Sequence, residues 1–168
     1  VPWVLAATGC RMQECCQAVV ADIKREDRIH FLQITEIGPG QSVKTLGSER
    51  RVTLHPRLIK EGFVKYVRSL PKGSRLFPEL SPDRFGNWGA AFGKYYGRWA
   101  RTIISDRNKV GHSWRHSFKT AAREAELPEE IHDALTGHVG DGSVGRDYGS
   151  VPLKTLARAI AKIDFGYS

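Results

Sequence analysis

Apolar residues recur every three or four positions along most of the chain, the spacing that places them on one face of an α-helix. The most complete stripe lies between positions 57 and 70, and Pro71 and Gly73 follow it as a stop signal. A narrower stripe closes the chain, from Leu153 to Ile163. The pattern predicts helices over 11–21, 57–70, 87–104, 112–126, 128–137 and 153–163.

Three short segments in the first third of the chain have the composition of β-strands instead. Residues 28–34 alternate in part between apolar and polar, and segments 42–45 and 50–54 flank a turn at 46–48. A three-stranded antiparallel meander is the simplest arrangement of these strands. The predicted fold class is therefore α+β and mainly helical, with a small three-stranded antiparallel sheet, in one domain spanning 1–168.

The charge balance narrows the choice of partner. The chain has 168 residues with 26 Lys and Arg against 18 Asp and Glu, which gives a formal net charge of +8 and a pI near 9.6. Such a surplus favours an anionic partner, most commonly nucleic acid, because bound cations release counterions from its backbone. A basic protein without a polyanionic ligand remains the alternative reading.

The segment 87–104 mixes large aromatic residues with Lys94, Arg98 and Arg101. Aromatic rings interleaved with cations can stack on bases and hold a phosphate backbone. The same pattern also describes a buried aromatic stripe with a solvated basic face, and we favour this second interpretation. The three cations could still reach phosphates from that face.

The cysteines bear on the redox environment of the protein, and the first residues bear on whether the sequence is a fragment. Cys10, Cys15 and Cys16 cluster without a CxxC pair, so we expect buried reduced thiols rather than a zinc site or a disulfide framework. A cytoplasmic location fits reduced thiols, and no apolar run is long enough for a membrane span. Because the chain starts at Val1 and its sole methionine is Met12, we expect a fragment of a longer protein.

The candidate chemistry lies between positions 112 and 148. His112 and Arg115 are three residues apart and share a helix face, which pairs an ionisable imidazole with a permanent cation. His138 follows a predicted helix stop at Gly137, and Tyr148 lies in a glycine-rich segment. This combination suits chemistry on a phosphate. Taken singly, His112 could instead cap a helix, and His138 could be a core histidine with satisfied hydrogen bonds.

Five motifs in order resemble those of the tyrosine recombinases, the phage integrase family. Residues 8–14 are similar to the Thr-Gly-x-Arg-x-x-Glu box, and residues 43–52 to the β-hairpin lysine motif. Residues 112–118 match the His-x-x-Arg-His box, residues 135–138 match the Leu-x-Gly-His box, and Tyr148 stands where the nucleophile belongs. The tyrosine segment departs from the common pattern, since Arg and Asp precede the tyrosine. The likeness covers essentially the whole chain, and it implies that an N-terminal core-binding domain is absent here.

The resemblance implies a site-specific DNA recombinase that cleaves and rejoins strands through a 3′-phosphotyrosyl intermediate, without metal or other cofactor. Arg11 and Arg115 would hold the scissile phosphate, and His138 would donate a hydrogen bond to it. The proton steps would fall to His112, as the acceptor for the tyrosine, and to Lys44, as the donor to the leaving 5′ oxygen.

The partners and rival functions follow from the resemblance together with the charge pattern. The partner would be double-stranded DNA of a bacterium or phage, contacted by Lys94, Arg98, Arg101 and Arg50. Self-association as a tetramer on DNA is expected, and the stripe from Leu153 to Ile163 could exchange between protomers or pack within its own domain. The alternatives are a type IB topoisomerase-like relaxation of supercoils and a non-catalytic, DNA-binding prophage remnant.

Overall fold

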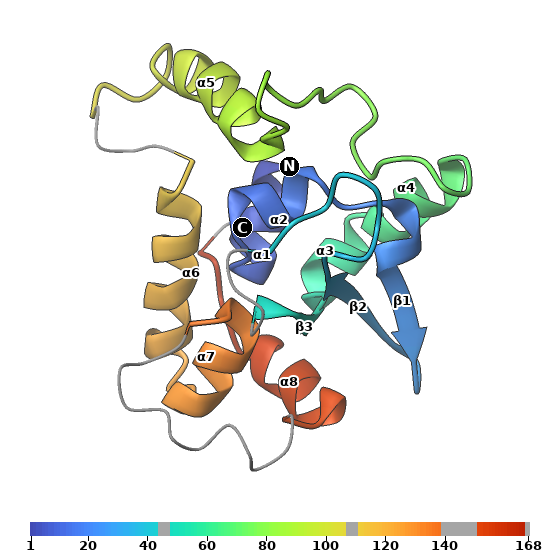
Figure 1. Ribbon diagram of the computed structural model, residues 1–168. Coiled ribbons are helices and arrows are strands. Elements are labelled where there is room, and N and C mark those ends of the chain that lie inside the picture. The colour runs from blue at the N-terminus through green and yellow to red at the C-terminus, as the bar shows by residue number, and fades with distance from the viewer. Residues whose placement is uncertain (44–47, 107–110, 139–150, 167–168) are drawn as a thin grey trace.

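A small sheet and the helices packed around it carry those parts of the predicted motifs that the structure describes (Figure 1). The computed structural model describes residues 1–43, 48–106, 111–138 and 151–166. Its elements are, in order, α1 (Pro2–Thr8), α2 (Met12–Cys16), the 3₁₀ turn η1 (Val20–Asp22), β1 (Ile23–Glu26), β2 (Ile29–Ile34), β3 (Arg50–Thr53), α3 (Pro56–Lys60), α4 (Phe63–Ser69), α5 (Trp88–Ala100), α6 (Ser113–Glu124), α7 (Glu129–Thr136) and α8 (Leu153–Ile160). The predicted fold class, mainly helical α+β with a small antiparallel sheet, is confirmed.

Two of the predicted helices are interrupted by local chemistry that the apolar spacing does not reveal. The helix predicted over 11–21 ends after Cys16, and the Asp22 side chain then accepts a 2.8 Å hydrogen bond from the Val19 amide at the 3₁₀ turn. The helix predicted over 57–70 divides into α3 and α4 at Gly62, which adopts φ 90°. A left-handed residue cannot continue a right-handed helix, so the chain restarts there. The helices α5 to α8 form within the predicted ranges.

The sheet is a three-stranded antiparallel meander in the order β1-β2-β3, but its first strand was not predicted. β1 carries charged residues at Lys24, Arg25 and Glu26, as edge strands often do, and these break the alternation. The strand predicted over 42–45 is wrong for Ser42 and Val43, which lie outside any strand, and the remainder of that segment lies outside the described residues.

The Gln17 side chain explains why Ser42 makes no strand pairing. Its amide nitrogen donates to the Ser42 carbonyl at 2.7 Å, and its amide oxygen accepts from the Ser42 N–H at 3.1 Å. Both backbone groups that a strand ladder would use are therefore satisfied by one side chain.

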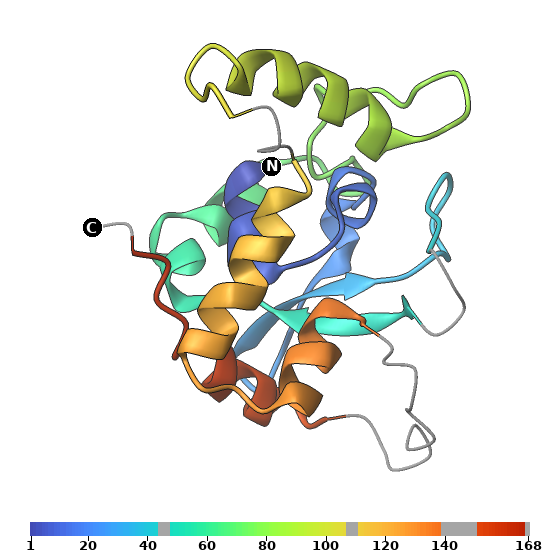
Figure 2. The ribbon, with the colours of Figure 1, turned by 90° about the vertical axis from the view of Figure 1, so that its left-hand side faces the viewer.

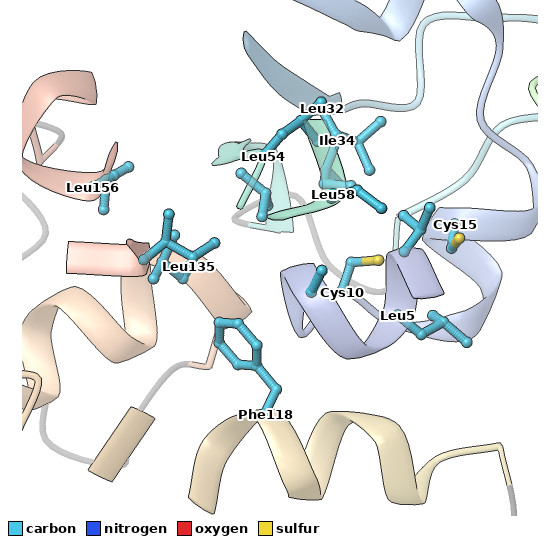
Figure 3. Close-up of a cluster of buried hydrophobic side chains, with 14 of the residues drawn as sticks. Leu5, Cys10, Cys15, Leu32, Ile34, Leu54, Leu58, Phe118, Leu135 and Leu156 are labelled. Carbon is cyan, nitrogen blue, oxygen red and sulfur yellow. The ribbon is translucent and has the colours of Figure 1, made fainter. Parts of the chain in front are cut away.

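The core forms where the sheet meets helices from both ends of the chain. α7 and α8 pack against β3, and α1 packs against α6 (Figure 2). Figure 3 shows that Leu32 and Leu54 from the sheet region face Phe118 of α6, Leu135 of α7 and Leu156 of α8. The predicted burial of the cysteines is confirmed: Cys10, Cys15 and Cys16 are free and at most 1% exposed.

The C-terminal stripe is covered by its own chain. Leu153, Leu156, Ile160 and Ile163 are each 5% exposed or less, and α8 lies on β2 and β3. Of the two arrangements that the sequence left open, packing within the domain is the observed one.

α5 lies at one end of the molecule, packed on α2 (Figure 1). Its aromatic residues divide between two environments, because Phe92 and Tyr96 are buried whereas Tyr95 and Trp99 are 62% and 50% exposed. The expected aromatic core stripe is thus only partly buried. No helix in the described part of the chain is long and apolar enough to cross a membrane.

Candidate active site

The turn between α1 and α2 positions Arg11, the first arginine of the predicted site. Gly9 ends α1 with φ 63°, and a Cβ at this position would lie 2.4 Å from the buried ring of Phe118. Only glycine combines that conformation with so close an approach to α6. Arg11 then stands at the N-cap of α2.

Arg11 is held by a buried carboxylate and a distant carbonyl. Its Nη1 donates to Glu14 Oε1 at 2.7 Å, and its backbone N–H donates to Glu14 Oε2 at 2.7 Å. Its Nη2 donates to the Gly137 carbonyl at 2.8 Å, across 126 residues of sequence. The side chain remains 24% exposed, so the guanidinium is both fixed and accessible.

Arg115 is anchored more deeply, in the first turn of α6. Its Nη1 donates to the Gly9 carbonyl at 2.7 Å and to the Thr136 carbonyl at 2.6 Å, and the residue is 8% exposed. Burial, with the nearby charges of Arg11 and Arg50, lowers its pKa to about 10, so it stays a cation at neutral pH. Its Nε and Nη2 have no hydrogen-bond partner in the described ranges, which leaves one bidentate edge of the fork for an anion.

His138 follows the end of α7. Gly137 terminates that helix with φ 62°, which turns the next residue out of it. The His138 side chain is 53% exposed, and its Nδ1 lies 3.7 Å from Asp133 Oδ1. Sequence reasoning missed Asp133, whose Oδ1 lies near His138 and also 3.1 Å from His132 Nδ1.

His112 stands at the N-cap of α6, exposed to solvent. Although the residue is exposed, partial burial of its ring lowers the pKa of His112 below the ordinary value, and the charges of His116, Arg115 and Arg11 lower it further. The ring of His116 meets it edge-on, with centroids 5.0 Å apart. An imidazole with a lowered pKa is neutral at pH 7 and able to accept a proton.

Arg50 has surroundings unlike those expected of a DNA contact. Its side chain is 9% exposed, and its Nη1 and Nη2 donate to the two oxygens of Glu14 at 3.0 and 2.8 Å. Burial raises the pKa of Glu14, but the bonds from Arg50 and Arg11 outweigh this, and the pKa lies below its usual value. Arg50 and Glu14 are 36 residues apart, with no spacing signal to link them.

Three arginines meet three consecutive carbonyls at the C-terminal end of α7. Arg50 Nε donates to Leu135 at 3.0 Å, Arg115 Nη1 to Thr136 at 2.6 Å, and Arg11 Nη2 to Gly137 at 2.8 Å. The last carbonyls of a helix have no partner within it, so guanidinium groups from β3, α6 and the start of α2 take that place. We call these three side chains the arginine cap.

Of the predicted site residues, the structure brings Arg11, Arg115 and His138 together at the end of α7, with His112 close enough to be influenced by both arginines. Lys44 and Tyr148 lie outside the described residues. The predicted DNA contacts Lys94 and Arg98 of α5, and Arg101 at its C-cap, are exposed. Among the residues described, no cluster of three or more His, Cys, Asp or Glu side chains is arranged to hold a metal ion.

Comparisons with known proteins find similarity in structure rather than in sequence. The chain resembles the integrase from mycobacterium phage Brujita, with a TM-score of 0.62 over 99% of this chain and 52% of that one, at 18% identity. It resembles the Tn1549 transposon integrase in complex with transposon right end DNA, with a TM-score of 0.55 over 94% and 56% at 18% identity. The XerH site-specific recombinase bound to difH gives 0.50 over 95% and 40% at 17% identity.

These likenesses confirm the fold that the resemblance implied, that of the integrases and recombinases. No protein-family model and no curated protein sequence matches the chain. The chain spans about half the length of the integrases it resembles.

Proposed function

We propose that this chain is the catalytic domain of a site-specific DNA recombinase of the integrase type, acting through a covalent 3′-phosphotyrosyl intermediate. The observation that carries the proposal is the arginine cap. Two of its members, Arg11 and Arg115, are fixed beside His138 and keep exposed or unbonded N–H groups. Fixed donors aimed at one position suit a phosphodiester, whose reaction adds charge to oxygens that are already negative.

The phosphate would be held by the two arginines and His138. Guanidinium is planar and permanently charged, so it can bind two phosphate oxygens at once. Arg115 offers its Nε and Nη2 edge for this purpose. His138 would donate a hydrogen bond to a nonbridging oxygen. The two guanidinium groups are already held by hydrogen bonds, so they would stabilise the transition state without moving.

The covalent step would use Tyr148 as the nucleophile. Ionising a phenol with a pKa of about 10 costs roughly 4 kcal/mol at neutral pH, which a cationic pocket and a base must offset. The phenolic oxygen bonds to phosphorus while the bond from phosphorus to the 5′ oxygen breaks. His112 takes the phenolic proton and Lys44 gives a proton to the leaving oxygen. A second 5′-hydroxyl can then reverse the step on another strand.

The partner of this chemistry would be double-stranded DNA. The net charge of +8 and the exposed cations Lys94, Arg98 and Arg101 of α5 support it. Self-association on DNA belongs to the same proposal. Exchange of α8 between protomers would require it to leave β3, on which it is packed here.

Covalent capture tests the proposal directly. Nicked duplexes with randomised sequence around the nick should yield a covalent protein–DNA adduct, because loss of the short 5′-hydroxyl strand traps the intermediate. Tyr148→Phe should abolish the adduct, whereas Tyr95→Phe, at an exposed tyrosine of α5, should retain it. An adduct that survives Tyr148→Phe would remove Tyr148 from the role. Salt-dependent DNA binding without any adduct would favour the non-catalytic reading.

A further inference from the structure

The buried arginine of strand β3 has no role in the chemistry above. We propose that Arg50 is a positioning residue of the site: it shares the charge of Glu14, so that Arg11 remains available to the phosphate, and it supports the turn that presents His138. The inference rests on the proposed function.

Glu14 is the point at which the two arginines meet. Each of its carboxylate oxygens accepts one bond from each arginine: Oε1 from Arg11 Nη1 and Arg50 Nη1, and Oε2 from the Arg11 backbone N–H and Arg50 Nη2. The four distances lie between 2.7 and 3.0 Å. Since the Glu14 side chain is only 2% exposed, water cannot replace either partner.

The charge at the site depends on this sharing. With Arg11 as its only partner, a buried carboxylate would neutralise that guanidinium and compete with the phosphate for its N–H groups. With Arg50 also bound, the three side chains keep a net positive charge, and Arg115 adds to it. Arg11 then donates from Nη1 to Glu14 and from Nη2 to the Gly137 carbonyl, and its side chain stays 24% exposed.

Arg50 also supports the turn at the end of α7. Its Nε donates to the Leu135 carbonyl at 3.0 Å, and its Nη1 donates to the Ser48 carbonyl at 2.9 Å. A Cβ at position 137 would lie 2.7 Å from Arg50 Nη1 and 2.8 Å from its Cζ, so the guanidinium lies directly against Gly137. The residue that follows this contact is His138.

A purely structural ion pair would predict something different. In that case loss of Arg50 lowers the melting temperature but leaves the phosphate affinity of the folded protein unchanged. The positioning role predicts a loss of affinity in protein that is still folded. It also predicts recovery when the Glu14 charge is removed, because the competitor for Arg11 then disappears.

The experiment uses Arg50→Met, Glu14→Gln and the double variant, with Arg51→Met as the matched control. Arg51 is the next residue of β3, and it pairs with Glu26 at the surface, at 3.2 Å. Arginine Nε–H resonances are followed by NMR during titration with inorganic phosphate at low ionic strength, below the melting temperature of every variant. The rate of adduct formation from saturating nicked DNA is measured in parallel.

We expect Arg50→Met to weaken phosphate binding about tenfold or more and to slow adduct formation about 10²-fold, the size of effect seen when one transition-state donor is lost. Glu14→Gln should restore the affinity of Arg50→Met to within about threefold of Glu14→Gln alone, and Arg51→Met should change nothing. Unchanged phosphate affinity and adduct rate in folded Arg50→Met would overturn the inference and leave the recombinase function standing.

The reverse failure is also distinguishable. The expected phosphate pattern in a chain that never forms an adduct would support the positioning role and refute the recombinase. If the wild-type chain binds no phosphate near Arg11, the positioning inference is overturned, and the adduct assay alone decides the recombinase function.

Discussion

A single methyl group added at Gly137 would strain the backbone and also push against the arginine cap, and the two effects on stability can be measured separately. Gly137 ends α7 with φ 62°, and a Cβ would lie 2.7, 2.8 and 3.0 Å from the Nη1, Cζ and Nε atoms of Arg50. We predict that Gly137→Ala destabilises the protein in two additive ways. It forces an alanine into a left-handed backbone conformation, and it displaces the Arg50 guanidinium.

The magnitude follows from those two mechanisms. A left-handed conformation costs an alanine roughly 1–2 kcal/mol relative to glycine. Arg50 cannot yield freely, because Glu14, Leu135 and Ser48 all accept hydrogen bonds from it. Displacing it forfeits at least one charged hydrogen bond, worth roughly 1.5–3 kcal/mol. The sum is about 2.5–5 kcal/mol, a large part of the 5–15 kcal/mol that typically stabilises a domain.

Gly62→Ala is the control for the backbone cost alone. Gly62 adopts φ 90° at the N-cap of α4, and a Cβ there meets nothing within 4 Å. We expect this variant to lose only roughly 1–2 kcal/mol. Urea denaturation at pH 7.5 measures both losses, provided that the dependence on denaturant is the same for each variant.

A double-mutant cycle isolates the steric part. In an Arg50→Ala background the guanidinium is gone, so the added cost of Gly137→Ala should fall to that of Gly62→Ala. The reasoning is refuted if Gly137→Ala costs no more than Gly62→Ala in the wild-type background, or if its cost is the same with and without Arg50.

Two further predictions concern acid stability and DNA binding. Burial and the Lys119 charge lower the pKa of His132 in the folded protein, although Asp133 raises it. As the pH falls, His132 is therefore protonated in the unfolded state before it is protonated in the folded state. Stability should therefore be full above about pH 6.5 and fall as the pH drops below it, and His132→Gln should flatten the loss measured in urea between pH 7.5 and 5.5. Replacing the α5 cations Lys94, Arg98 and Arg101 by Gln should reduce the slope of log affinity for duplex DNA against log salt by about 3, whereas replacing exposed cations of α4 should not.

The sequence predicted the elements that carry strong periodic patterns and missed those set by single side chains. The stripes over 112–126 and 153–163 contain the observed α6 and α8 because burial of a continuous apolar face dominates their energy. The non-strand conformation of Ser42 depends on one glutamine 25 residues earlier. No local pattern encodes such a contact.

The site residues fall into the same two groups: some follow from motifs, and one depends on a single long-range contact. The motifs placed Arg11, Arg115 and His138, which the fold brings to one helix end. Arg50, which was expected to contact DNA, is buried instead, with a side chain that is 9% exposed. Its burial follows from Glu14, a carboxylate that the core encloses and that no single arginine satisfies. Long-range pairing of buried charges has no signature in one sequence.

The arginine cap also links the stability of the fold to the electrostatics of the site. A helix C-terminus carries partial negative charge on its unpaired carbonyls, and α7 presents those of Leu135, Thr136 and Gly137 to three cations. The same bonds that satisfy the helix end therefore hold the guanidinium groups in place before any ligand arrives. Because the bonds already exist in the folded chain, the cations would need no reorganisation to bind a phosphate. The repulsion between these like charges is overcome when the chain folds, not when a phosphate binds.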